Sequence, residues 1–115
     1  MKFLMIFEST PGAPPPSPET LAKLGAYTQR MLASGTVLLT GGVVRPSHGI
    51  KIKNDGDKVT VTDGPFAESK ELIDGFAVVT ANSKEEAIAL STEFMQIAGE
   101  GKGEILQIFE GGPPQ

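Results

Sequence analysis

The sequence contains no cysteine, no tryptophan and a single histidine, His48. Without cysteine, the chain can form no disulfide and has no thiolate for catalysis or metal binding. One histidine also argues against a histidine-based metal centre. The glycines match neither a phosphate-binding loop nor a dinucleotide-binding motif. We therefore expect neither a metal nor a cofactor.

Positive charge and long apolar runs are also scarce. The net charge is −4 and the isoelectric point is about 4.9, which argues against nucleic acid or an anionic membrane as a partner. No apolar run approaches the length of a membrane span. The apolar N-terminal run reaches an acid at Glu8, too early for a signal peptide, so the expected location is the cytoplasm.

The composition that is present is that of a folded domain. Of the 115 residues, 39% are hydrophobic and 21% are charged, which predicts one domain, residues 1–115, with a single core. Prolines crowd residues 10–17 and predict an extended surface loop, because proline fixes φ and removes a hydrogen-bond donor. The Gly- and Pro-rich residues 111–115 are expected to form a loose tail.

Hydrophobic periodicity and capping residues predict seven elements. Ser17 and the Ser83–Glu86 capping box are expected to begin helices, and Gly35 and Gly99 to end them. Period-2 alternation around Asn54–Asp57 predicts a β-hairpin. Gly41–Gly42 suggests a bulge or a close backbone approach, and residues 69–74 a short irregular or helical piece. In chain order the elements are a strand at 3–7, a helix at 18–34, a strand at 36–40 extending towards 43–44, the hairpin at 50–62, a strand at 75–80, a helix from 83 to 98, and a strand at 104–109 after a flexible link at Gly101 and Gly103.

Without the hairpin, this order is β-α-β-β-α-β. It predicts an α+β, ferredoxin-like fold with an antiparallel sheet, two helices on one face and an inserted β-hairpin. The strands are apolar on both faces, as in Phe3–Phe7. The face without helices must then be covered, most simply by a second copy of the chain, so we expect a homodimer.

The stretch Val61–Glu71 reads Val-Thr-Asp-Gly-Pro-Phe-Ala-Glu-Ser-Lys-Glu and is followed by Gly75–Phe76. It resembles the signature of the DGPF-type proteins within the YCII-related family. Gly41–Gly42 and residues 45–49 resemble the segment before the hairpin in that family. The resemblance implies a dimeric α/β barrel with clefts between sheet and helices. It also implies a His–Asp pair as catalytic residues, for which this chain offers His48 and Asp63.

The residues of this stretch have both chemical and structural interpretations. Asp63 could act as a general base or cap amides in an Asx-turn. Glu68 could be an acid/base group and Lys70 an anchor for an anion, or Lys70 could form a solvated ion pair with Glu68, Glu71 or Asp74. His48 could serve the site or lie exposed in a turn.

Three further residues complete the candidate set. Arg45 could clamp a carboxylate or cover apolar surface with its stem, and Ser47 beside it is a candidate ligand-binding residue. A Ser47–His48–Asp63 triad is set aside, because adjacent side chains project differently and no oxyanion-hole pattern surrounds them. Tyr27, the single tyrosine, is expected at the edge of the core or with its hydroxyl in the cleft.

These features support two functions. The first is a homodimeric barrel with a small-molecule cleft, which binds a ligand or performs cofactor-independent acid/base chemistry. The second is a non-catalytic structural or regulatory module that binds a partner, which would need an exposed apolar patch.

Overall fold

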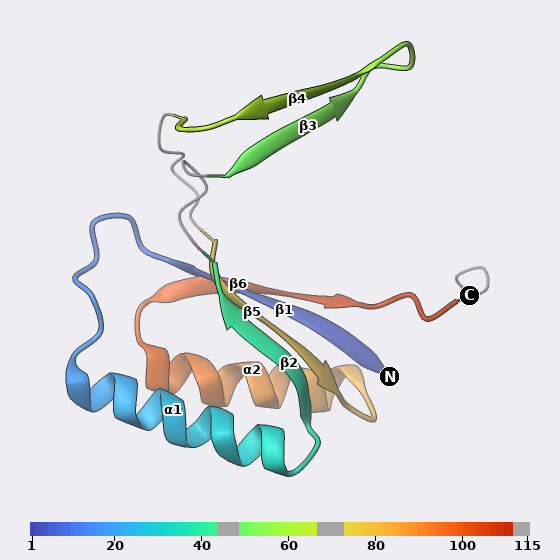
Figure 1. Ribbon diagram of the computed structural model, residues 1–115. Helices are drawn as coiled ribbons and strands as arrows, with labels where there is room; N and C mark the ends of the chain where they lie inside the picture. Colours follow the sequence, from blue (N-terminus) through green and yellow to red (C-terminus); the bar gives the residue numbers. More distant parts are fainter. Residues whose placement is uncertain (44–48, 67–72, 112–115) are drawn as a thin grey trace.

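The computed structural model describes residues 1–43, 49–66 and 73–111 (Figure 1). Its elements, in chain order, are β1 (Lys2–Ser9), α1 (Pro18–Ala33), β2 (Val37–Gly42), β3 (Ile50–Asn54), β4 (Val59–Asp63), β5 (Ile73–Thr80), α2 (Lys84–Ala98) and β6 (Gly101–Gln107).

Four strands form an antiparallel sheet in the order β2-β5-β1-β6, and both helices lie on one face of it (Figure 1). This is the ferredoxin-like α+β arrangement, as predicted. The hairpin β3–β4 forms a separate two-stranded sheet that projects from the body of the molecule.

Both helices begin at the predicted serines. The backbone N–H of Thr20 donates to Ser17 Oγ and that of Glu86 to Ser83 Oγ, each at 3.1 Å. The second half of the capping box differs from the prediction. The carboxylate of Glu86 accepts from the N–H of Asn82 at 3.3 Å, one residue before the expected amide.

The cross-strand register separates the two faces of the sheet. Phe3 and Val79 are paired, face the helices and pack with Ala87 of α2, and each is at most 2% exposed. By alternation, Leu4 and Val78 lie on the opposite face, called here the open face.

The last strand begins earlier than predicted, because Gly101 and Gly103 belong to β6 and are not a flexible link. They lie against β1: a Cβ at Gly101 would approach the carbonyl oxygen of Glu8 to 2.7 Å, and one at Gly103 would approach that of Ile6 to 2.9 Å. Glycine is needed here for close strand packing.

The irregularities in the sheet lie elsewhere than expected. The bulge of β2 falls at Val37–Leu39, before the glycine pair. A close approach does occur at Gly41, whose carbonyl oxygen would lie 3.2 Å from a Cβ at Gly75. Ile73 and Asp74 belong to β5, so the prediction of an irregular or helical piece is wrong for these two residues, and positions 69–72 lie outside the described residues.

The hairpin turn uses the predicted Asn and Asp side chains. Asn54 Oδ1 accepts from the N–H of Gly56, and Asp55 Oδ1 accepts from the N–H groups of Asp57 and Lys58. The hydrogen bonds from the backbone N–H groups of Lys58 and then Asp57 lower the pKa of the Asp55 carboxyl. Gly64 N–H donates to Gly49 O at the base of the hairpin, next to the cis Gly64–Pro65 peptide bond.

Candidate functional site

A cleft of about 810 Å³ lies between the helix-facing side of the sheet and the two helices. Its origin is visible in the register. The core end of the sheet presents Phe3 and Val79 to the helices, whereas the row that contains Phe7 continues across the neighbouring strands as Gly75, Gly42 and Gly103. Because three of the four positions in that row are glycine, they contribute no side chain to fill the space between sheet and helices, and Gly42 and Gly75 line this cleft.

The walls of the cleft are mainly apolar. The rings of Phe7 and Phe94 meet edge to face, with centroids 5.5 Å apart and an interplanar angle of 77°. Aliphatic and thioether side chains come from strand and helices, and the proline-rich loop closes one side. The principal apolar lining residues are Met5, Leu24, Met31, Met95 and residues 14–16. Such walls suit an organic molecule with aromatic or aliphatic surface.

Asp74 supplies a carboxylate to this cleft. In the register, Phe7 pairs with Gly75 and Glu8 with Ile73, so Asp74 is the extra residue of a β-bulge. Its Oδ2 accepts a hydrogen bond from the backbone N–H of Ser9 at 3.2 Å, and both residues line the cleft. Bulges commonly redirect side chains next to functional sites.

Tyr27 lies at the junction of cleft and core. Its side chain is 8% exposed and its hydroxyl donates to the carbonyl oxygen of Leu90 at 3.2 Å. Burial raises the pKa of the phenol; the charge of Glu93 raises it further, and Arg30 lowers it. The residue is therefore a core-edge tyrosine that also contributes to the cleft wall, combining the two predicted positions.

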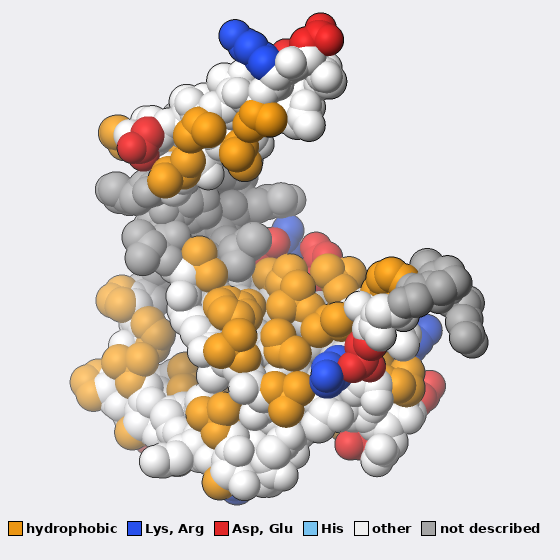
Figure 2. All heavy atoms as spheres, turned by 45° about the vertical axis from the view of Figure 1, so that its right-hand side comes forward, with side chains coloured by type: hydrophobic (Ala, Val, Ile, Leu, Met, Phe, Trp, Pro, Cys, Tyr) orange, Lys and Arg blue, Asp and Glu red, His pale blue; other side chains and the backbone are white. Residues whose placement is uncertain are grey.

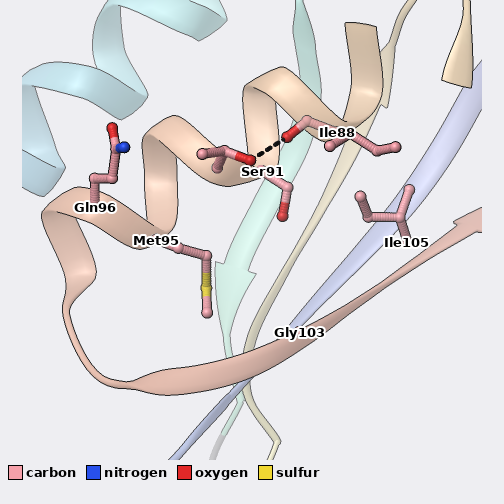
Figure 3. A pocket seen from close by; sticks show the side chains of 7 residues that line it. Ile88, Ser91, Met95, Gln96, Gly103 and Ile105 are labelled. Atoms are coloured by element: carbon pink, nitrogen blue, oxygen red, sulfur yellow. Dashed lines mark hydrogen bonds between the residues drawn. The ribbon is translucent and has the colours of Figure 1, made fainter. Parts of the chain in front are cut away.

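A second, more open groove of about 410 Å³ lies between α2 and β6 (Figure 3). Met95 and Ser91 line both this groove and the larger cleft. The close-up shows Met95 pointing down from α2 towards β6, where Gly103 leaves room for it. The dashed line marks the bond from Thr92 Oγ1 to the carbonyl oxygen of Ile88, 2.8 Å, within α2.

Of the sequence-predicted site residues, the structure places Asp63. It ends β4, is exposed, pairs in register with Ile50, and is not among the residues that line the cleft. The others, Arg45, Ser47, His48, Glu68 and Lys70, lie outside the described residues, so the His48–Asp63 pair stays a prediction.

Sequence reasoning missed Ser9 and Asp74 as cleft residues. Asp74 was considered only as an ion-pair partner for Lys70, because its strand was expected to begin at Gly75. The available signal was the distribution of glycine: Gly42, Gly75 and Gly103 come from three different strands. Their alignment at one level of the sheet needs the register, which the sequence does not give directly.

The arrangement defines a class: a ferredoxin-like α+β domain with a helix–sheet cleft and a projecting hairpin. The chain belongs to the YCII-related domain family, whose model matches residues 1–110. It is also similar to the solved structure of 5-chloro-2-hydroxyhydroquinone dehydrochlorinase (TftG) from Burkholderia phenoliruptrix AC1100, in complex with 2,5-dihydroxybenzoquinone. The TM-score is 0.61 and the sequence identity is 17%, over 96% of each chain.

That likeness, at this identity, shows the fold. A search of curated proteins found no match. No described helix is long and apolar enough to cross a membrane.

Proposed function

We propose that this protein binds a small organic molecule in the cleft between the sheet and the two helices. The observation that carries the proposal is the row formed by Gly42, Gly75 and Phe7, which lines an apolar space with the Asp74 carboxylate at its edge. An apolar pocket with few polar groups is the usual form of a small-molecule site.

The similar TftG structure supports a ligand about as large as one six-membered ring, because it contains 2,5-dihydroxybenzoquinone. Cofactor-independent acid/base chemistry would need a carboxylate or imidazole within hydrogen-bond reach of the ligand. Asp74 is a candidate from the described cleft, and Asp63 with His48 remains the pair predicted from the sequence.

The test uses 2,5-dihydroxybenzoquinone as a probe in an NMR titration of the ¹⁵N-labelled protein. We expect the largest amide shifts at Phe7, Gly42 and Gly75, which line the cleft. Gly42→Ala should weaken binding several-fold, because the new Cβ has room, 3.6 Å from the carbonyl oxygen of Asp74, and projects from the cleft side of β2.

Gly25→Ala, on an exposed position of α1 that does not line the cleft, is the matched control. Its Cβ would meet no atom within 4 Å, so binding should change little. Shifts confined to regions away from the cleft, or equal losses in the two variants, would contradict the proposed site.

We also propose that the protein is a homodimer, in which each copy covers the open sheet face of the other. The support is the apolar row Leu39, Val78, Leu4 and Leu106, which crosses all four strands on that face. Leu39 and Leu106 are 58% and 46% exposed in the single chain. Light scattering should give a mass near twice the 12.1 kDa of one chain.

A monomer in that measurement would favour the second function, a non-catalytic module whose exposed apolar face binds a different protein. The same exposed row supports this alternative. A cytoplasmic location stays a prediction for either function.

A further inference from the structure

The hairpin β3–β4 has two chemically different faces. Ile52 pairs with Val61, and their neighbours Ile50 and Val59 share that face, each between 55% and 70% exposed. The other face carries lysines and threonines, as in the pair Lys53 and Thr60. The hairpin therefore has one face suited to burial and one suited to water.

Such a hairpin is a poor structure on its own. Two strands with one exposed apolar face are marginally stable in water, and a third strand or a packing partner is normally required. Within the described chain, the hairpin pairs with no strand of the larger sheet. Its four aliphatic side chains are each at least 55% exposed, so this face lacks cover within the described chain.

The open face of the four-stranded sheet has the same need and a similar size. Its apolar row across four strands spans about 14 Å, and each five-residue strand of the hairpin is about 17 Å long. Figure 2 shows hydrophobic side chains, in orange, both on the hairpin and on the body beneath it in the same view. Two surfaces that face the same way can both be covered by one copy related by a two-fold axis.

We propose that, in the homodimer, the hairpin of each copy packs its aliphatic face against the open sheet face of the other copy. This inference rests on the proposed dimer and specifies how its interface is built. The contact is isologous, because the hairpin of each chain meets the sheet of its partner. The same contact therefore forms two times in the dimer, and it buries the hairpin face and the open sheet face of both copies. Lys51 and Lys53 stay on the solvent side of the hairpin.

The same geometry gives Asp63 a position in the assembly. Two residues after Val61, it lies on the aliphatic face of β4, opposite Ile50. In the proposed dimer, the carboxylate of Asp63 faces the partner subunit at the base of the hairpin. Asp63, which the sequence predicts as a catalytic residue, therefore lies at the proposed dimer interface.

Because the natural chain has no cysteine, the test can use single-cysteine variants without background. Ile52→Cys is mixed with either Leu39→Cys or Leu106→Cys, which lie at the two ends of the sheet row. After subunit exchange, a short thiol-specific cross-linker is added and the products are identified by mass spectrometry. We expect cross-links between the two different variants, since each chain carries one thiol and every cross-link is intermolecular.

Lys53→Cys is the matched control on the opposite face of the same strand, and it should cross-link far less to either sheet variant. Ile52→Lys should also weaken the dimer by about tenfold or more, whereas Lys53→Ala should leave it unchanged.

The outcomes separate the two proposals. A wild-type dimer that gives no hairpin-to-sheet cross-link, or links Ile52→Cys only to itself, overturns the hairpin contact and leaves the dimer standing. A wild-type monomer overturns both.

Discussion

Tyr27 connects the small core of this protein with its cleft. The phenol is buried between the helices, donates to the carbonyl of Leu90, and has the guanidinium of Arg30 5.4 Å from its ring centroid. Arg30 in turn forms a 2.9 Å ion pair with Glu93. Tyr27 therefore anchors α1 to α2 on one side of the cleft.

Replacing Tyr27 by phenylalanine should lower the free energy of unfolding by about 1 kcal/mol, because the ring stays and one hydrogen bond is lost. Urea denaturation measures this change. An unchanged unfolding midpoint would show that the bond to Leu90 contributes nothing to stability.

Ionisation of the same residue, Tyr27, should lower the stability of the folded protein at alkaline pH. The pKa of Tyr27 is raised in the folded state, so folding favours the protonated phenol. Its contribution is fully present below the unfolded pKa, near 10, and is lost as the pH rises from there through the folded pKa. The decline should be smaller in Tyr27→Phe. As the single tyrosine in a chain without tryptophan, Tyr27 can be titrated by ultraviolet absorbance.

At the scale of elements, the local signals predicted helices better than strands. Ser17 and Ser83 cap the helices as expected, because capping depends on a few neighbouring residues. The start of β6 was misplaced, because glycine is a poor strand former on its own. At Gly101 and Gly103 tertiary contact overrides that preference, since only glycine fits against β1.

Ser83→Ala should lower the free energy of unfolding by about 1 kcal/mol through loss of the N-cap of α2. Lys84→Ala, at the next and exposed position, should change it by less than about 0.5 kcal/mol. Denaturation of both variants under one set of conditions checks the difference. Equal effects would mean that the cap contributes no more than an ordinary surface position.

For the whole molecule, the pattern of apolar strands was enough to predict the sheet, the helix layer and an open face in need of cover. The cleft could not be predicted in the same way, because it depends on which residues of four strands share one level. Phe7 and Gly75 are 68 positions apart in the chain, and Gly42 and Gly103 come from two other strands. Likewise, Asp74 is the extra residue of the bulge opposite Phe7 and Glu8, and the sequence pattern does not indicate that bulge.

The open face makes the stability of the molecule a property of two chains. Few hydrophobic side chains are deeply buried in the described single chain: Phe3, Tyr27, Val79, Ala81 and Ala87. If a second copy covers the open face, folding and association are linked, and the melting temperature should rise with protein concentration.

Leu39→Lys should remove this dependence of the melting temperature on protein concentration and should lower the melting temperature, because Leu39 lies at one end of the apolar row on the open face. Leu32→Lys, on an exposed position of α1, is the matched control and should keep the dependence. A melting temperature independent of concentration in the wild type would contradict the dimer and leave the open face to another partner.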